Sequence, residues 1–211
     1  TMPYRILAGH SLGGIAVLNA LYTAPEAFNA FVAIDPSLWW DDRVLLKKAK
    51  DFFASTRLDG RALYVAQANT ITPGDTARNV HFESITAFDA IMSTFDRSGI
   101  RYAYHYYPKD SHGSVPMIAE YDALRFTFES YDLPVERILG DPSLLEEHFR
   151  TVSEQLGATF EPSDGLLRLL VQAAPYVDST KAVTFAEMRV ARFPDHPRPY
   201  EALGDFWAAK G

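Results

Sequence analysis

Apolar residues in the first 130 positions fall into four short runs, separated by stretches in which apolar positions follow a helical spacing. The runs are YRILAG (4–9), AFVAID (30–35), RALYVAQA (61–68) and RYAYHYY (101–107). The second and third are almost continuously apolar, as in parallel strands buried on both faces. The intervening stretches predict helices over about 12–24, 41–55 and 77–98, and a closing helix over 115–130. This alternation predicts an α/β sheet with crossover helices.

After about residue 133 the strand pattern stops and one helical pattern follows another. These segments are DPSLLEEHFRTVSEQL (141–156), SDGLLRLLVQAA (163–174), TKAVTFAEMRVARF (180–193) and RPYEALGDFWAAKG (198–211). Leu166 and Leu169 recur as Tyr200 and Leu203 after 34 residues, which is the tetratricopeptide period. We therefore expect two domains, which are an α/β domain over 1–132 and an incomplete, all-α, tetratricopeptide-like extension over 133–211. A plain helical appendage is the alternative.

Composition narrows the function classes. The 211 residues have a net charge of -7 and no basic block, which argues against a nucleic-acid partner. The chain has no cysteine, which excludes disulfides, thiolate catalysis and cysteine-based zinc sites but leaves cytoplasm and periplasm equally open. No apolar run approaches the roughly 20 residues of a membrane helix, so no membrane association is expected.

The segment GHSLG (9–13) follows the first predicted strand and precedes the first predicted helix. It matches G-x-S-x-G, the nucleophile elbow, in which a strained turn exposes a serine hydroxyl. Gly9 and Gly13 would remove side chains that collide across this turn. Ser11 is therefore the candidate nucleophile, and the N–H of Leu12, at a helix N-terminus, is the candidate oxyanion donor. A glycine-rich turn or a phosphate cradle is the alternative.

A serine nucleophile needs a histidine base, and the chain has six histidines. His112 lies in the loop PKDSHGSVP, after the last predicted strand and before a capped helix, where an exposed base is expected. The others fall inside the elbow, in the last strand or in helices, and the side chain of His10 should point away from the hydroxyl. His112 is therefore the candidate base.

The acid that would orient this histidine is less well defined. Asp35 is the last residue of the second apolar run, which is expected to lie beside the strand that leads into the nucleophile elbow. A carboxylate at this position would be half-buried and would need a partner. Asp75 follows the third strand after a long loop, and Glu83, Asp110 or no acid at all remain alternatives. Asp35 could instead form an Asx turn with the N–H groups of the residues that follow it. We take Asp35 as the candidate acid and Asp75 as the alternative.

Trp39 and Trp40 follow the second strand, at the rim where catalytic loops gather. Paired tryptophans are most often packing residues, so they are candidate substrate contacts only. No metal site and no cofactor are expected.

Four segments together resemble one known family. GHSLGG, AIDPSLWW, HGSVPMIAEYDALRF and LGDFWAAKG are similar to the esterase family that includes esterase D and the enterochelin (iron-siderophore) esterases, in the branch with a tetratricopeptide-like extension. This resemblance implies an α/β-hydrolase fold, serine esterase activity, and Ser11 and His112 as nucleophile and base. Family members commonly have serine where this chain has Asp35, with an acid near the position of Asn69, so a Ser–His dyad remains an alternative.

The resemblance also implies that strands, and a second oxyanion donor, precede the elbow in the parent protein. Losing one such donor typically costs about 100- to 1,000-fold in turnover, so we expect weak or no activity from this segment alone. The sequence predicts a serine hydrolase acting on small carboxylic esters, siderophore-type or short-chain. The alternative is a non-catalytic module that binds a protein partner, or itself, through the helical extension.

Overall fold

The computed structural model describes residues 4–75, 79–94 and 99–208. The chain divides into two compact units, which are unit 1 (Thr1–Ser130 and Glu154–Ala158) and unit 2 (Tyr131–Ser153 and Thr159–Gly211). No helix within the described residues has the length and apolar character that a membrane crossing requires.

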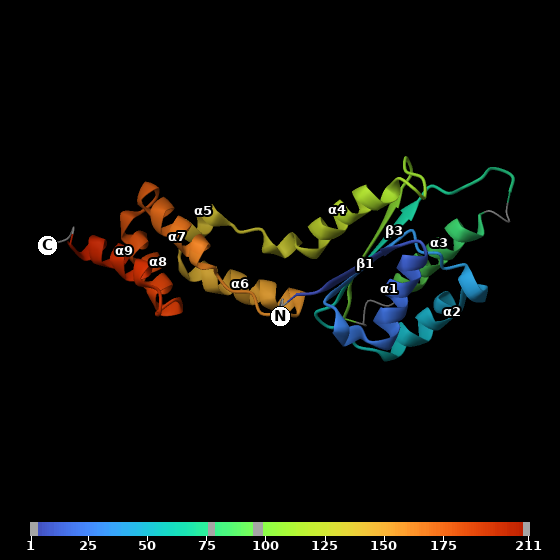
Figure 1. Ribbon diagram of the computed structural model, residues 1–211, viewed down its shortest axis with the longest axis horizontal. Coiled ribbons are helices and arrows are strands. Elements are labelled where there is room, and N and C mark those ends of the chain that lie inside the picture. Colours follow the sequence, from blue (N-terminus) through green and yellow to red (C-terminus); the bar gives the residue numbers. More distant parts are fainter. Residues whose placement is uncertain (1–3, 76–78, 95–98, 209–211) are drawn as a thin grey trace. The chain divides into compact units, whose positions relative to one another are not determined.

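Unit 1 is built on a parallel sheet whose strands follow one another in chain order (Figure 1). The strands are β1 (Ile6–His10), β2 (Ala30–Ile34), β3 (Ala62–Ala68) and β4 (Arg101–Tyr107). The register aligns Ile6 with Ala30, Ala30 with Ala62, and Ala62 with Arg101. The carboxyl ends of all four strands therefore lie at one edge, and functional residues in such sheets gather there.

The helices of unit 1 cover both faces of this sheet. The connecting helices are α1 (Leu12–Thr23), α2 (Trp40–Ser55) and α3 (Val80–Met92). Because neighbouring strands are consecutive and parallel crossovers are right-handed, all three belong on the same face. α4 (Val115–Thr127) follows β4 and packs against β2 and β3 on the opposite face.

Alternating strand residues supply the two apolar layers. Phe31 of β2 and Leu63 of β3 point into the core formed with α1, α2 and α3. Their neighbours Val32 and Tyr64 point into the core formed with α4. The sheet is thus buried on both faces, which explains why β2 and β3 are continuously apolar in sequence.

The structure confirms the predicted parallel sheet. The four strands and the helices at 12–23 and 40–55 agree with prediction to within two residues, although Asp41, Asp42 and Arg43 have positive φ and interrupt the first turn of α2. The prediction of a helix over 77–98 falls partly outside the described residues, and the described helix is Val80–Met92. The helix predicted over 115–130 ends at Thr127 and is followed by the short 3-10 turn Glu129–Tyr131.

Beyond this turn the chain continues in helices. They are α5 (Val135–Gly140), α6 (Ser143–Leu156), α7 (Asp164–Ala173) with a 3-10 turn (Ala174–Tyr176), α8 (Ser179–Arg192) and α9 (Pro197–Ala208). Ser163 and Asp178 cap α7 and α8 by accepting backbone N–H bonds. Arg189 is 4% exposed and makes two hydrogen bonds to Asp164, at 2.6 and 2.9 Å, which tie α8 to α7.

Candidate active site

Ser11 lies in the sharp turn between β1 and α1. Its backbone has φ 59° and ψ −116°, a conformation outside the regions that residues with a side chain normally adopt. Its N–H donates to the carbonyl of Ile34 at 3.0 Å, and its own carbonyl accepts from Gly14 and Ile15 of the first helical turn. These bonds hold the strained turn, which directs the hydroxyl toward the carboxyl end of the sheet.

The glycines around this turn have separate roles. A Cβ on Gly9 would collide with the backbone carbonyl of Gly13, and a Cβ on Gly14 would lie 2.8 Å from Cβ of Pro36. A Cβ on Gly13 would meet nothing within 4 Å. The expectation that Gly13 also relieves a collision through its missing side chain is therefore wrong, because it is the Gly13 backbone that Gly9 must avoid.

This difference gives a matched pair of variants. Gly9→Ala is expected to lower the free energy of unfolding by about 1–3 kcal/mol, because the strand and helix would have to separate to admit a methyl group. Gly13→Ala is expected to raise it by up to about 1 kcal/mol, because alanine favours the helix. Urea denaturation followed by circular dichroism measures both, and equal stability of Gly9→Ala and wild type would contradict the argument.

Asp35 lies immediately after β2, with a fully buried side chain and a left-handed φ of 42°. Aspartate enters this region more readily than most residues. Its N–H donates to the carbonyl of Ala66, and its Oδ1 accepts from the N–H of Ala68 at 2.9 Å. The carboxylate is therefore bonded to the end of the neighbouring strand β3. In this structure it does not form the Asx turn considered as the alternative, since the N–H of Ser37 donates to the carbonyl of Ser11.

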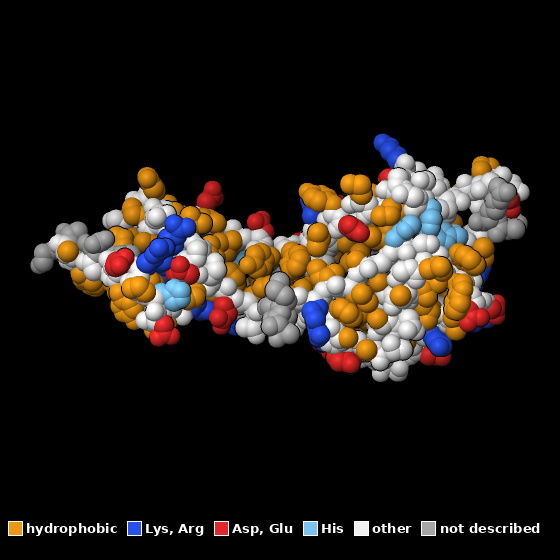
Figure 2. All heavy atoms as spheres, in the orientation of Figure 1, with side chains coloured by type: hydrophobic (Ala, Val, Ile, Leu, Met, Phe, Trp, Pro, Cys, Tyr) orange, Lys and Arg blue, Asp and Glu red, His pale blue; other side chains and the backbone are white. Residues whose placement is uncertain are grey.

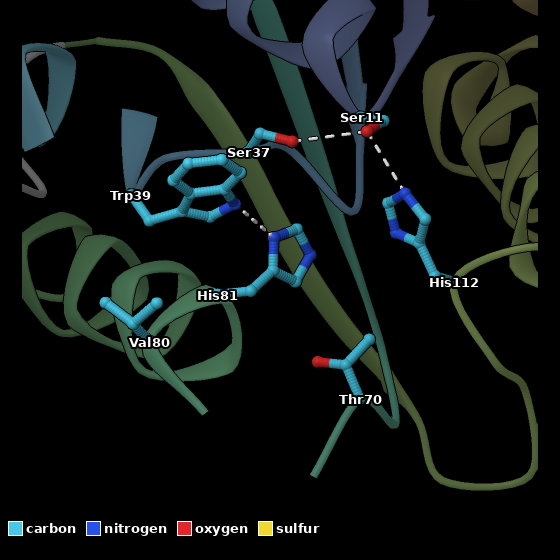
Figure 3. Close-up of a pocket in the computed structure, with 7 residues that line it drawn as sticks. All are labelled: Ser11, Ser37, Trp39, Thr70, Val80, His81 and His112. Atoms are coloured by element: carbon cyan, nitrogen blue, oxygen red, sulfur yellow. Dashed lines mark hydrogen bonds between the residues drawn. The ribbon is translucent and has the colours of Figure 1, made fainter. Parts of the chain in front are cut away.

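His112 lies in the loop between β4 and α4 and bonds to both residues. Its Nδ1 lies 2.6 Å from Oδ2 of Asp35. Its Nε2 lies 3.1 Å from Oγ of Ser11, and Figure 3 shows this second bond. Since a carboxylate only accepts, Nδ1 bears the proton and Nε2 accepts from the serine hydroxyl. The structure thus brings Ser11, His112 and Asp35, which are up to 101 positions apart in sequence, into one hydrogen-bonded chain.

The environment of Asp35 favours its charged form. Burial acts to raise the pKa of this carboxyl group, but hydrogen bonds from His81, His112 and the N–H of Ala68 outweigh it. The pKa of Asp35 therefore lies below its ordinary value of 3.8. The carboxylate stays ionised at neutral pH, as an acceptor for His112 must.

This shift has a consequence for stability. Because the folded-state pKa of Asp35 is depressed, its contribution to the free energy of unfolding is present above pH 3.8 and is lost as the pH falls through the lower, folded-state value. We expect the stability advantage of wild type over Asp35→Asn to be constant above about pH 5 and to shrink below about pH 4. Urea denaturation at pH 3–6 measures it, and an advantage that grows on acidification would contradict this sign.

The other candidate acids have different surroundings. Asp75 lies in a turn in which its N–H donates to the carbonyl of Thr72. Glu83 pairs with Arg43 at 3.8 Å, and Asp110 accepts from the hydroxyl of Ser114 at 3.0 Å. The carboxylate that the structure brings to His112 is that of Asp35.

Comparison with known proteins gives a consistent result. Over 52 residues, 25% of this chain, the sequence is 42% identical to the siderophore enterobactin esterase of Emericella nidulans, of which it covers 17%. Over 129 residues, 58% of this chain, it is 29% identical to the ferri-bacillibactin esterase BesA of Bacillus subtilis, of which it covers 42%. The chain is similar to siderophore esterases. These relatives confirm the esterase part of the resemblance inferred from the motifs. No protein-family model matches the sequence.

A solved structure is similar over most of the chain. The IroE-like serine hydrolase from Shewanella oneidensis has a TM-score of 0.77 and 26% sequence identity, covering 92% of this chain and 60% of that one. Unit 1 therefore has an α/β-hydrolase-type sheet. The chain spans less than half of the two curated relatives and under two thirds of this hydrolase.

A cavity of about 390 Å³ opens beside the Ser11 hydroxyl. Its lining consists of Ser11, Ser37, Trp39, Thr70, Val80, His81 and His112 (Figure 3). Of the two candidate substrate contacts, Trp39 lines this cavity. Trp40, the first residue of α2, is 48% exposed and is not part of this lining.

Ser37 is a neighbour of the nucleophile that the sequence did not single out. Its hydroxyl lies 3.2 Å from that of Ser11, and the residue is 3% exposed. With the Ser11 proton directed at His112, the Ser37 hydroxyl is the donor in this pair. The tight turn that follows β2 begins with the sequence Asp-Pro-Ser (35–37) and brings both Asp35 and Ser37 to the elbow.

Histidine side chains gather on this part of unit 1 (Figure 2). The ring of His112 lies with its centroid 4.4 Å from that of His10 and 5.2 Å from that of His81. Burial and the neighbouring His112 lower the pKa of His10 below 6.5. His10 thus packs beside the base as a neutral ring, whereas the hydroxyl of Ser11 bonds to His112 and Ser37.

His81 is the residue that sequence reasoning missed. It lies at the start of α3, where the chain gives no local indication of chemistry, and its Nε2 is 3.0 Å from Oδ2 of Asp35. The facing atoms of Asp35, His81 and His112 lie within 4.8 Å of one another, a set that could hold a metal ion. However, the indole N–H of Trp39 donates to Nδ1 of His81, which assigns the proton of a neutral ring to Nε2. The nitrogen that faces Asp35 is then a hydrogen-bond donor, not a metal ligand.

Proposed function

We propose that this chain is the catalytic part of a serine hydrolase that cleaves carboxylic esters through a covalent acyl-enzyme. Ser11 is the nucleophile, His112 the general base and acid, and Asp35 the carboxylate that orients His112. The observation that supports this most strongly is the continuous chain from Oγ of Ser11 to Nε2 of His112 at 3.1 Å and from Nδ1 to Oδ2 of Asp35 at 2.6 Å.

In the first half-reaction, Oγ of Ser11 attacks the ester carbonyl carbon while its proton passes to Nε2 of His112. The buried carboxylate of Asp35 stabilises the imidazolium that forms and keeps Nδ1 as the donor. Leu12 is the first residue of α1, so its N–H has no acceptor within the helix and is the proposed donor to the developing oxyanion. The tetrahedral intermediate then collapses, and His112 returns the proton to the leaving alcohol.

In the second half-reaction, His112 takes a proton from water, and the resulting hydroxide attacks the acyl carbon on Ser11. The bond from this carbon to Oγ then breaks, His112 returns the proton to Oγ of Ser11, and the acid is released. The proposed substrates are siderophore-type or short-chain esters, since the named relatives are siderophore esterases. An acceptor other than water would turn the same residues into an acyltransferase.

Burst kinetics test this proposal. With p-nitrophenyl acetate we expect a rapid release of about one equivalent of p-nitrophenol per protein, followed by slower turnover as the acyl-enzyme hydrolyses. A burst needs only one turnover, so it remains visible if steady-state turnover is slow. The matched control is His112→Gln, which should lose the burst. A burst of the same size in His112→Gln and in the wild-type chain would contradict the proposal.

A second function is proposed for the helical extension over 133–211. α7 begins at Asp164 and α9 at Pro197, 33 residues later, which is within one residue of the tetratricopeptide period, and α8 lies between them in sequence. Exposed apolar side chains on this part of the chain include Leu169, Tyr176, Val177 and Tyr200. Such a surface could bind a protein partner or a second copy. A chain that binds a partner but gives no burst would favour a non-catalytic module.

A further inference from the structure

His81 makes two hydrogen bonds that connect the pocket wall to the candidate acid. Its Nε2 lies 3.0 Å from Oδ2 of Asp35, and its Nδ1 lies 3.0 Å from the indole nitrogen of Trp39. Its side chain is 13% exposed, against 0% for Asp35. Trp39, His81 and His112 all line the same cavity (Figure 3).

The chemistry of the partners fixes the direction of both bonds. An indole nitrogen can only donate, so Nδ1 of His81 is an acceptor and Nε2 of the neutral ring carries the proton. An ionised carboxylate can only accept, so this proton points at Oδ2 of Asp35. A proton on Nδ1 would face the indole N–H, and Trp39 therefore selects the tautomer that donates to Asp35.

We propose that His81 is a positioning residue of the hydrolytic site, which holds the Asp35 carboxylate ionised and oriented toward His112 and is itself held in the donating tautomer by Trp39. This inference rests on the proposed function. Trp39 donates to His81 and His81 donates to Asp35 on one side of the carboxylate, while Ser11 donates to His112 and His112 donates to Asp35 on the other.

The carboxylate geometry explains why a second donor is useful. Oδ1 is occupied by the N–H of Ala68, and Oδ2 accepts from His81 and His112. Without His81, the carboxylate would be held by the N–H of Ala68 and by the imidazole of His112, which is the group that it has to orient. With His81 on Oδ2 as well, the carboxylate plane is held from both β3 and α3, and the oxygen that faces His112 remains charged.

Three variants test this role with the whole chain. His81→Phe fills the space but removes both hydrogen bonds, whereas His81→Gln keeps an N–H for Asp35 and an oxygen for Trp39. His105→Gln is the matched control, because His105 is an exposed histidine on β4. For each variant the pH dependence of kcat and kcat/KM is measured with p-nitrophenyl acetate, together with thermal unfolding.

We expect His81→Phe to lower kcat by about 10- to 100-fold, the size of a lost hydrogen bond to a charged group, with KM changed less than threefold. The low-pH end of the acid limb, where protonation of Asp35 removes the acceptor of His112, should move to higher pH, because Asp35 loses one of the bonds that lower its pKa. The groups that face this carboxylate are His81 and His112, with His10 beside His112. His81→Gln should stay within about threefold of wild type and retain the acid limb, and His105→Gln should match wild type.

A spectroscopic measurement separates this proposal from the proposed function. In ¹⁵N-labelled protein, the His81 signals should show a protonated Nε2 and an unprotonated Nδ1, and the Trp39→Phe variant should lose this preference. If Ser11→Ala retains the wild-type turnover, the proposed function fails while the tautomer measurement still tests His81. If Ser11→Ala is inactive but His81→Phe keeps the wild-type kcat and acid limb, the positioning role alone is overturned. A protonated Nδ1 of His81 would also overturn it.

Discussion

Ser11→Ala is expected to abolish ester hydrolysis, with a loss of at least about 10⁴-fold in kcat. The expected loss is this large because the account assigns the covalent bond itself to Oγ of Ser11, and no repositioning of His112 can replace that atom. The neighbouring hydroxyl of Ser37, 3.2 Å away, provides the critical comparison. Ser37 is 3% exposed, and the histidine bond is made by Ser11.

Ser37→Ala is accordingly expected to cost less than about tenfold, the size of one neutral hydrogen bond to the nucleophile. Both variants are compared with wild type in the burst assay, and circular dichroism verifies that they are folded. A burst that survives in Ser11→Ala and disappears in Ser37→Ala would show that Ser37, and not Ser11, is the nucleophile.

Asp35→Asn is expected to lower kcat by about 10³- to 10⁴-fold while leaving the fold intact. Asparagine tolerates the left-handed backbone that Asp35 adopts, so the turn after β2 can persist. Its amide is uncharged, however, and presents an N–H group that can turn the imidazole of His112 into the wrong tautomer. The loss should appear in kcat more than in KM, because Asp35 acts on the base and does not line the cavity.

Asp75→Asn is the matched control, since Asp75 follows β3 and was the alternative acid in the sequence. We expect it to stay within about threefold of wild type in kcat. If Asp75→Asn lost activity and Asp35→Asn did not, the assignment would be reversed. If neither changed kcat more than tenfold, the site would operate as a Ser–His dyad.

The parts of the site that sequence could predict are those with a local basis. Ser11 is identified by a strand, two glycines at fixed spacing and a helix, all within a few residues. His112 is identified by its place in a loop between a strand and a capped helix. Both predictions use properties of short segments, and the structure brings the two side chains together.

The remaining parts depend on how strands are arranged. Asp35 faces His112 because β2 lies between β1 and β3, which makes its carboxyl end adjacent to the elbow. His81 faces Asp35 because α3 begins at the carboxyl edge of the sheet. Neither relation has a signature within a short segment, so the sequence leaves the identity of the acid open and does not point to His81.

The fold itself was more predictable than the site. Continuous apolar runs identified β2 and β3, since both of their faces are buried, and glycine, proline and capping residues delimited the helices. The predicted role of Gly13 is wrong because only Gly9 needs to lack a Cβ at this contact. Gly13 contributes its backbone carbonyl, which a Cβ on Gly9 would strike. Such a collision is visible only in three dimensions.

Covalent labelling tests the central claim most directly. The chain is incubated with a fluorophosphonate, which reacts with activated serine hydroxyls, and the adduct is located by tandem mass spectrometry of the digested protein. The account predicts one phosphonate on the peptide that contains Ser11, formed much more slowly in Asp35→Asn and absent in Ser11→Ala. An unlabelled chain, or an adduct on Ser37 or another residue, would contradict it.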